Sequence, residues 1–241
     1  MKSMFVLAVA TALFAGAPAP SSAQDYAAII AAPDRADADR QTDQRRDPVK
    51  LLAFTGVKTG MTVLDMGAGG GYSTELMARA VGPTGKVYGQ DHEKGARAKE
   101  RFEARMKTDA MKKVVALDRP FDDPLPADAT NLDLITFFFF YHDTAWLNVD
   151  RAKMNRALYN ALKPGGILVV ADHSAKAGEG ANVAKSLHRI DESLVRRELE
   201  AAGFQFVSAG NFLRNPADPR EAQVQKNTVP NDEFVLKFRK P

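Results

Sequence analysis

The chain has 241 residues, of which 45% are apolar, and this is enough for one well-buried domain but cramped for two. Lysine and arginine outnumber aspartate and glutamate by 33 to 30, and this small excess is spread along the chain. No basic run indicates binding to nucleic acid or to an anionic membrane. The chain has no cysteine, which excludes a disulfide, a thiol nucleophile and a thiolate metal site.

The first residues predict a secretory signal peptide over positions 1–23. Lys2 supplies a positive start, Met4–Ala15 an apolar run, and the small residues ending at Ala23 a cleavage site. The apolar run is short for a transmembrane helix, and Pro18 and Pro20 would break a helix that continued beyond it. We therefore expect a periplasmic or secreted protein with no stable membrane span after cleavage. The alternatives are an uncleaved anchor and an inefficiently cleaved protein that works in the cytoplasm.

Two short helices are predicted ahead of the main domain. Asp34–Gln44 is a charged stretch of helical character, and Asp47-Pro48 is a good start for a second helix over Val49–Phe54. This N-terminal segment, residues 24–56, is therefore helical and polar.

The stretch Val63–Ser73 predicts a strand, a tight glycine turn and then a helix. Residues 62–64 are β-formers, Asp65 closes the strand, and the glycines at 67, 69, 70 and 71 allow positive φ values and close approach of a ligand. Ser73 is expected to cap a helix over Thr74–Ala80, whose free N–H groups face the turn and favour polar or anionic groups.

The spacing of these glycines separates two classes of cofactor. The dinucleotide fingerprint Gly-x-Gly-x-x-Gly would place its third glycine at position 72, where this chain has Tyr72. The chain instead has Asp-x-Gly-x-Gly-x-Gly from Asp65 to Gly71, with an acid beneath the turn that can meet a cationic amine. This pattern resembles the first motif of the seven-stranded S-adenosylmethionine-dependent methyltransferases. A purely structural turn is the alternative.

The resemblance implies S-adenosylmethionine as the cofactor and a turn that wraps its amino-acid end. The residues that it assigns to cofactor binding here are Asp65, Gly67, Ala68, Gly69, Gly71 and Tyr72. In such proteins an N-terminal segment often folds over the cofactor, so residues 24–56 are expected to form a helical cap. Arg45, Arg46 and Asp47 are then lid residues, or else an ordinary solvated face.

The next predicted strand, Lys86–Asp91, ends in a second acid. Asp91 lies about 20 residues past the glycine turn, as a βαβ unit requires for an acid that accepts the hydroxyls of a ribose. His92 follows it and is assigned to the same cofactor site. Alternatively, Asp91 only caps the helix predicted over Glu93–Lys107.

A third strand, Val114–Leu117, leads into the loop 118–129, which in the related enzymes lies against the adenine. The candidates for that contact are Asp118, Phe121 and Asp122. Leu132–Phe140 is a continuous apolar run, typical of a strand that is covered on both faces at the centre of a parallel sheet.

The rest of the chain continues the alternation of strands and helices. The predicted elements are a helix from Asn148 to Pro164, a strand at Ile167–Ala171, a helix at Ala184–Ala202, and two antiparallel strands at Phe204–Ala209 and Asp232–Phe238. By resemblance, residues 57–241 form one methyltransferase domain. This domain is an α/β three-layer sandwich of Rossmann-like type, whose mostly parallel sheet has seven strands in the order 3-2-1-4-5-7-6.

Candidate catalytic residues follow the fourth strand. In an open parallel sheet, ligands bind beyond the carboxyl ends of the strands where the strand order reverses, here between the first and fourth strands. We expect His142 to act as the base that accepts the acceptor's proton and Asp143 to orient its imidazole. Tyr141 is expected to lie beside the sulfonium group of the cofactor. It is therefore assigned to both catalysis and cofactor binding. His173 and His188 are alternative bases.

A metal site is the other possibility for these side chains. It would use His142, Asp143, Asp172 and His173, but no pair has the local His-x-x-x-His spacing, so we expect no metal. The chain also lacks Gly-x-Ser-x-Gly, which argues against an α/β-hydrolase.

The sequence thus predicts an enzyme that transfers a methyl group from S-adenosylmethionine to an unidentified small molecule. No residue specifies the acceptor or the oligomeric state. Export is the difficulty, because no twin-arginine pair precedes the apolar run, and a chain that crosses unfolded carries no cytoplasmic cofactor with it. The alternative is an exported ligand-binding protein that retains the fold without catalysis, although Asp65, Asp91 and the glycines favour the enzyme.

Overall fold

The structure is a computed structural model that describes residues 24–241. The predicted signal peptide, residues 1–23, lies outside the described residues. Among the described helices, none is both long enough and apolar enough to span a membrane.

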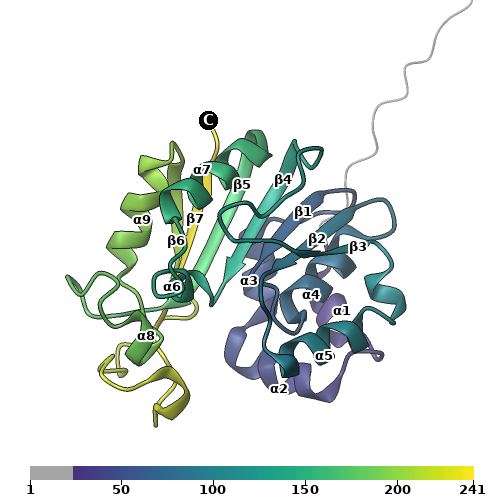
Figure 1. The fold of residues 1–241 in the computed structure, drawn as a ribbon. Coiled ribbons are helices and arrows are strands. Elements are labelled where there is room, and N and C mark those ends of the chain that lie inside the picture. The colour runs from purple at the N-terminus through teal and green to yellow at the C-terminus, as the bar shows by residue number, and fades with distance from the viewer. Residues whose placement is uncertain (1–23) are drawn as a thin grey trace, which may run out of the picture.

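Seven strands form one sheet in the predicted order, β3-β2-β1-β4-β5-β7-β6 (Figure 1). The strands are β1 (Thr62–Met66), β2 (Lys86–Asp91), β3 (Val114–Asp118), β4 (Leu132–Phe138), β5 (Leu162–His173), β6 (Gln205–Gly210) and β7 (Glu233–Arg239). Strands β1 to β5 pair in parallel, whereas β7 runs antiparallel to both of its neighbours, β5 and β6. The predicted α/β fold is confirmed.

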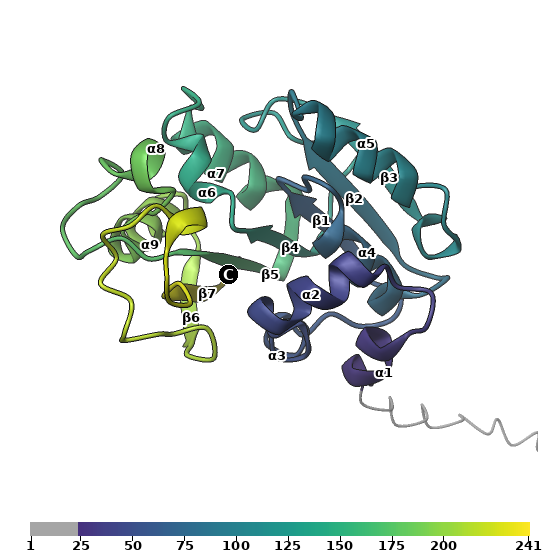
Figure 2. The ribbon, with the colours of Figure 1, turned by 90° about the horizontal axis from the view of Figure 1, so that it is seen from below.

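The helices fill the connections between the strands. They are α1 (Tyr26–Ala31), α2 (Asp37–Arg46), α3 (Pro48–Thr55), α4 (Tyr72–Val81), α5 (Ala96–Arg105), α6 (Tyr141–Thr144), α7 (Arg151–Ala161), α8 (Ala184–Leu187) and α9 (Glu192–Ala201), with short 3-10 turns at Asp109–Met111 and Val224–Lys226. Figure 2, which views the molecule from below, shows α2, α8 and the loop before β7 around the edge where the parallel strands end.

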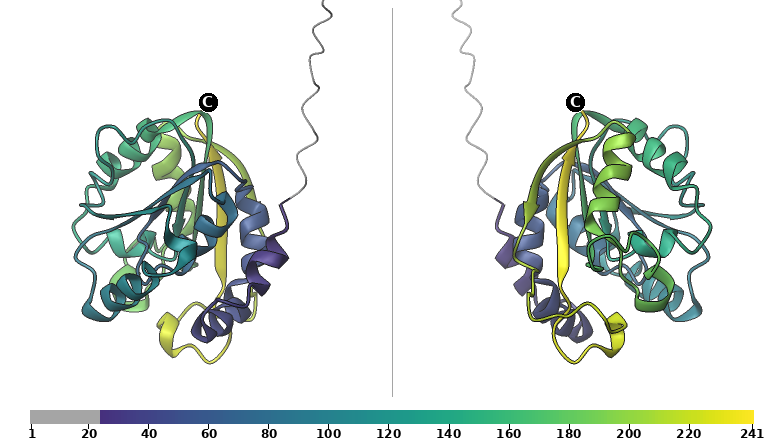
Figure 3. Two further views of the ribbon diagram at one scale, coloured as in Figure 1. Left: turned by 90° about the vertical axis from the view of Figure 1, so that its right-hand side faces the viewer. Right: turned by 90° about the vertical axis from the view of Figure 1, so that its left-hand side faces the viewer.

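Helices cover both faces of the sheet because successive strand residues point to opposite sides. Val63 and Val169 belong to a buried cluster with side chains of α3 and α4, whereas Leu64 and Leu168 belong to a second cluster with side chains of α7 and α9. Figure 3 shows the purple N-terminal helices on one side of the sheet and the green helices on the other. The result is the predicted three-layer sandwich.

Two helix starts differ from the prediction. Helix α4 begins at Tyr72 after Gly71, and the Ser73 hydroxyl makes no capping bond but donates to Asp65 instead. Helix α7 begins at Arg151 and not at Asn148, because Asn148 adopts a left-handed backbone conformation with φ of 56°. Asp150 caps α7 by accepting a hydrogen bond from the backbone N–H of Lys153.

The single helix predicted over 184–202 is two helices. Helix α8 ends at Leu187 and is followed by His188, whose φ is 54°. Helix α9 starts after Asp191, which accepts a capping bond from the N–H of Ser193. A left-handed residue cannot continue a right-handed helix, so the chain turns at His188. This break leaves the His188 side chain at the carboxyl edge of the sheet, where it reaches α6.

The loop between β6 and β7 is fastened by a buried ion pair. The Arg189 guanidinium, which is fully buried, donates to both carboxylate oxygens of Asp218 at 2.8 and 3.3 Å. Arg189 also donates to the backbone oxygen of Ser174 and to the side chain of Asn231. These bonds attach the loop to the end of β5, so the loop forms one wall of the site described below.

Replacing Arg189 tests this attachment. Removing one partner of a buried ion pair leaves an uncompensated buried charge, so Arg189→Met is expected to lower the free energy of unfolding by about 3–5 kcal/mol. Urea denaturation followed by circular dichroism measures the loss. The control is Arg196→Met, whose pair with Glu200 is exposed and is expected to contribute about 0.2–1 kcal/mol. Equal losses in the two variants would contradict the structural role of Arg189.

Candidate functional site

The glycine turn between β1 and α4 requires glycine at specific positions. Gly67, Gly69 and Gly71 have φ values of 62°, 51° and 84°, which side chains rarely adopt. A Cβ at Gly67 would lie 2.9 Å from the Phe140 side chain. The turn and Phe140 can therefore pack together only because residue 67 has no side chain. Gly71 is buried and faces α5, where a Cβ would meet the Arg105 and Phe102 side chains, so glycine at this position supports the turn. Its predicted contact with the cofactor stays a prediction.

Asp65 lies beneath this turn and is fully buried. Its carboxylate accepts three hydroxyl hydrogen bonds of 2.7 to 2.8 Å, from Ser73 and Thr74 on α4 and from Thr136 on β4. Burial raises the pKa of Asp65, although these hydrogen bonds oppose the shift. The direct contact with a cationic amine expected from the sequence is therefore wrong for this arrangement, because hydroxyl groups already enclose the acid.

The first cavity, of about 650 Å³, lies between the glycine turn and the N-terminal helix α2. Gly67, Ala68, Gly69 and Tyr72 line it on the turn side, as predicted. On the other side lie Arg45 and Arg46, the two residues considered as a lid.

Arg46 is one of four arginines that line this cavity. Its guanidinium lies over the Phe139 ring, 4.4 Å from the centroid, and its Nε has no hydrogen-bond partner among the described residues. Burial, with the nearby charge of Arg45, lowers the pKa of Arg46 to about 10. Because this pKa is well above 7, the side chain stays charged near neutral pH. It can therefore bind an anionic group or an aromatic ring of a ligand.

The second cavity, of about 510 Å³, continues from the first past Gly69. Asp91, His92, Phe121 and Asp122 line it, as predicted for a nucleoside site. Asp91 accepts hydrogen bonds from the backbone N–H groups of Gly69 and His92, one on each oxygen, so each oxygen keeps a lone pair for a ligand hydroxyl. Burial raises the pKa of Asp91.

Asp118 is not one of the described residues that line this cavity. Its side chain is exposed and lies 3.2 Å from Nδ1 of His92, so its predicted contact with the adenine is wrong. The reason is the register of the sheet: Asp118 pairs with Asp91 at the end of the edge strand β3, one strand farther from the crevice. Phe121 takes the interior position and stacks on Phe140, with ring centroids 5.1 Å apart.

The third cavity, of about 470 Å³, opens at the end of β5. It is lined by Arg45, Arg46, Phe139, His142, Asp143, His173, His188, Val224, Gln225 and Asn231. It shares Phe139 and both arginines with the first cavity and Asp143 with the second. The three cavities therefore adjoin one another at the edge where the strand order reverses between β1 and β4, and together they are called the crevice below.

His142 is oriented by a buried acid. Its Nδ1 lies 2.7 Å from Oδ1 of Asp172, and its backbone N–H donates to the other carboxylate oxygen. Burial opposes the charged imidazolium, but the Asp172 carboxylate outweighs it and raises the pKa of His142. Because the carboxylate only accepts, Nδ1 carries a proton, and Nε2 is the atom that faces Asp143 and His188.

Tyr141 does not face the crevice, which corrects its predicted contact with the sulfonium. The ring is fully buried between the sheet and the helices, and its hydroxyl donates to Glu198 and accepts a bond from Asn155. Position 141 starts α6, where the inward direction of the helix points toward α7 and α9. Phe140, one residue earlier, lines both the first and second cavities instead.

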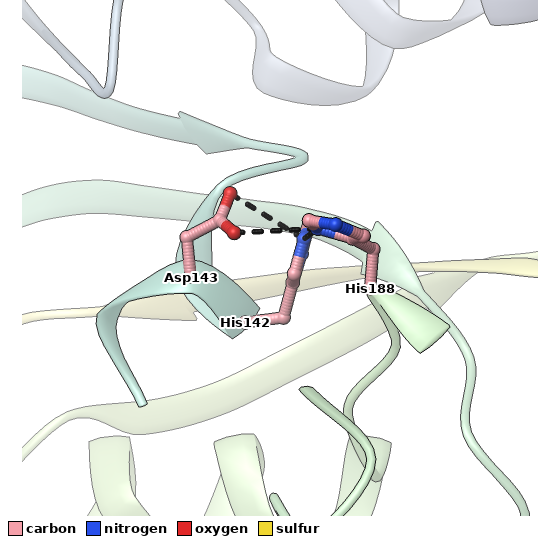
Figure 4. Close-up of side chains that lie close together, drawn as sticks. All are labelled: His142, Asp143 and His188. Atoms are coloured by element: carbon pink, nitrogen blue, oxygen red, sulfur yellow. Dashed lines mark hydrogen bonds and ion pairs between the residues drawn. The ribbon is translucent and has the colours of Figure 1, made fainter. Parts of the chain in front are cut away.

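Asp143 and His188 complete the cluster around His142 (Figure 4). Nε2 of His142 lies 3.3 Å from Nδ1 of His188 and 3.4 Å from Oδ2 of Asp143, and Nδ1 of His188 lies 3.4 Å from Oδ1 of Asp143. His173 contributes no ligand atom to this cluster, although its ring centroid lies 5.8 Å from that of His142. Its Nδ1 is 2.9 Å from Glu233, and neither atom makes a hydrogen bond within the described chain. The role expected for Asp143, to orient the His142 imidazole, belongs to Asp172 in this structure, and Asp143 lies on the Nε2 side of the ring.

The sequence did not indicate Phe139 and Phe140 as site residues. Both stand at the end of an apolar run, and nothing in the residue pattern distinguishes a buried strand residue from one that lines a cavity. Phe139 has φ of 59°, which is costly for an aromatic residue and directs the chain out of β4 into α6.

Ion pairs hold the N-terminal helices over the crevice. Arg105 on α5 donates two hydrogen bonds to Asp39 on α2, at 2.6 and 2.9 Å, and also bonds to Glu75 and to the backbone oxygen of Gly70. Tyr72 on α4 donates to Asp43 on α2 at 2.6 Å. Helix α2 thus contacts the glycine turn through specific side chains, as a cap does.

Comparison with known proteins places this geometry in a family. A family profile described as "Methyltransferase domain" matches residues 57–203, more than half of the chain. The ubiquinone/menaquinone biosynthesis C-methyltransferase UbiE of Enterobacter sp. (strain 638) is 27% identical over 75% of this chain and 70% of that protein. The chloroplastic 2-phytyl-1,4-beta-naphthoquinone methyltransferase of Arabidopsis thaliana is 29% identical over 50% of this chain, which spans only 45% of that relative.

Solved structures share the fold. A SAM-dependent methyltransferase from Aquifex aeolicus has a TM-score of 0.60 at 22% identity, covering 85% of this chain and 97% of that one. The [4+2]-cyclase SpnF has a TM-score of 0.59 at 18% identity, covering 85% and 81%. At these identities the likeness concerns the fold alone, and the cyclase illustrates that this fold serves more than one reaction.

Replacing Arg105 tests the attachment of α2. Each lost hydrogen bond between charged groups contributes about 1.5–3 kcal/mol, so Arg105→Ala is expected to speed amide exchange in residues 37–46 roughly tenfold to a hundredfold. Hydrogen exchange followed by mass spectrometry measures this. Arg101→Ala is the matched control, because Arg101 lies one turn earlier on α5 and lines the same cavity. If Arg101→Ala speeds exchange equally, the attachment is not specific to Arg105.

Proposed function

Since the chain belongs to the S-adenosylmethionine-dependent methyltransferase family, we propose that it transfers a methyl group from S-adenosylmethionine to a small, polar, oxygen-bearing molecule. The observation that supports the proposal is the set of three adjoining cavities, which are lined in turn by a glycine turn, an acid placed to bind a ribose, and polar side chains.

The residues present fit the cofactor. Gly69 has open space where a Cβ would project, so the backbone of the turn is accessible at the junction of the first two cavities. Asp91 has lone pairs for two ribose hydroxyls, and the Phe121 and Phe140 rings supply an aromatic wall for a purine. When bound, the cofactor supplies an electrophilic methyl group on a sulfonium, and the chain positions the acceptor for an in-line displacement.

The acceptor is assigned to the third cavity. Only two of its lining side chains are apolar, Phe139 and Val224, which suits a small polar molecule better than one with a long apolar tail. His142, Asp143 and His188 face this space and are the groups able to bind a hydroxyl or take its proton. The relatives named for quinone methylation share the domain, and we do not transfer their substrates to this chain.

The cofactor site can be separated from the acceptor site by two substitutions. Asp91→Ala is expected to weaken S-adenosylmethionine binding roughly tenfold to a hundredfold, because ribose hydrogen bonds to a carboxylate are lost. His142→Ala is expected to leave that binding nearly unchanged and to reduce turnover by about 10² to 10⁴. Calorimetric titration gives the affinities for S-adenosylmethionine and S-adenosylhomocysteine. Formation of S-adenosylhomocysteine with a panel of small hydroxyl compounds gives turnover.

Asp118→Ala is the matched control for Asp91, since Asp118 occupies the paired position on the next strand and lies outside the cavity. It should bind as the wild type does. Equal loss of binding in the Asp91 and His142 variants would refute the division of roles. A folded wild-type chain that binds neither ligand at millimolar concentration would favour the other candidate, a ligand-binding protein on the methyltransferase fold.

We also propose that the protein is exported after removal of residues 1–23, on the pattern of that segment. Mass spectrometry of the N-terminus in separated cell fractions tests this. We expect a chain that starts at Gln24 in the periplasm or the medium. A chain that starts at Met1 in the cytosol would disprove export and would remove the difficulty of cofactor supply.

A further inference from the structure

Three side chains from two distant parts of the chain bring their ligand atoms to one point of the crevice. His142 and Asp143 lie on α6, and His188 follows α8, 46 residues after His142. One ligand atom of each residue lies within 4.8 Å of the others (Figure 4). Sequence spacing could not indicate this set, because the third member follows a separate helix.

The distances within the set match those around a tetrahedral metal ion. The three closest approaches are 3.3, 3.4 and 3.4 Å. Zinc binds histidine nitrogen and carboxylate oxygen at about 2.0–2.1 Å, so two ligands of a tetrahedral ion lie about 3.3–3.4 Å apart. The two imidazoles approach different oxygens of Asp143, Oδ2 and Oδ1, so this carboxylate has to turn for one oxygen to complete the set. With one atom from each residue, the three ligand atoms lie within 4.8 Å of one another.

The three side chains can each offer a lone pair to the same point. Asp172 accepts the Nδ1 proton of His142, so a neutral His142 presents a bare lone pair at Nε2. Asp143 presents a carboxylate, which also only accepts. In the neutral form of His142, Nε2 and the Asp143 carboxylate can therefore each offer a lone pair to a cation placed between them.

The residues that form hydrogen bonds with His142 and Asp143 are arranged like the outer hydrogen-bond partners of metal ligands. Asp172 is fully buried and is fixed by the backbone N–H groups of His142 and His173, so the His142 ring is held in one orientation. The indole N–H of Trp146 donates to Asp143 at 3.0 Å. Such outer hydrogen bonds fix the tautomer and direction of metal ligands and are a regular part of metal sites.

We propose that His142 Nε2, His188 Nδ1 and the Asp143 carboxylate bind a divalent transition-metal ion, with Zn²⁺ as the best match. Two imidazoles and one carboxylate favour such an ion over Mg²⁺ or Ca²⁺, which prefer oxygen ligands. Three protein ligands leave a fourth position open to the third cavity, which these residues line. The sequence-based expectation of no metal is thereby replaced by this proposal.

The metal site goes beyond the methyl transfer proposed above and does not require it. If an acceptor hydroxyl occupies the open position, the ion lowers its pKa by direct coordination. His142 is then a ligand of the ion and no longer a free base. The His142→Ala variant loses turnover in either case, so metal binding has to be measured directly.

The experiment uses the full chain after metal removal with a chelating resin. Calorimetric titration with Zn²⁺ is expected to show one site of micromolar affinity or tighter, and titration with Co²⁺ is expected to give the intense visible bands of a tetrahedral ion. His188→Ala and Asp143→Asn should each lower Zn²⁺ affinity at least about tenfold by removing a ligand. Asp172→Asn should lower it roughly tenfold to a hundredfold while the Co²⁺ bands remain, since only the outer partner changes.

Two histidine variants serve as controls. His173→Ala removes an imidazole from the same cavity, and His92→Ala removes one from the second cavity. Both should bind Zn²⁺ as the wild type does. A folded wild-type chain that binds no Zn²⁺, or His188→Ala and Asp143→Asn variants that bind it unchanged, would overturn the proposal. The S-adenosylmethionine titration is independent, so failure of the metal site and failure of the methyltransferase function give different results.

Discussion

The hydrogen bonds to Asp65 hold the centre of this molecule together. One buried carboxylate joins the end of β1 to β4 through Thr136 and to α4 through Ser73 and Thr74. These are the two strands between which the strand order reverses, so the same acid fixes the spacing of the crevice and the path of the glycine turn above it. The turn then places Gly69 against Asp91, and Gly67 against Phe140, and these residues line the first and second cavities.

Much of this arrangement could be predicted from the sequence because it depends on local chemistry. The glycine spacing required a particular turn, the acid at the end of β2 lay at the distance that a βαβ unit sets, and the continuous apolar run of β4 indicated a central strand. Asp91, His92 and Phe121 accordingly lie where the pattern put them. The sheet order followed from the resemblance to a family and not from residue patterns, and the structure confirms it.

The predictions were wrong where the direction of a side chain, and not its position in the sequence, determines whether it reaches the site. Tyr141 and His142 are neighbours, yet α6 turns the tyrosine into the core and the histidine toward the crevice, and no periodicity exists in so short a helix. His188 lies in a segment of helical pattern, and only its left-handed conformation brings it to His142. Asp65 had the right position but a different role, because its hydroxyl partners come from two separate elements.

The position of β7 has a consequence for how the chain folds. β7 lies between β5 and β6, so these two strands do not pair with each other. Each of them pairs with residues 233–239 instead, and the edge of β5 that faces β7 is covered only when those residues are in place. Until then β5 presents a long unpaired edge, of the kind that invites association between chains. Contacts that join early and late segments also form slowly. Until residues 233–239 are in place, the sheet therefore keeps an uncovered edge at β5, and folding intermediates of this domain are most prone to associate there.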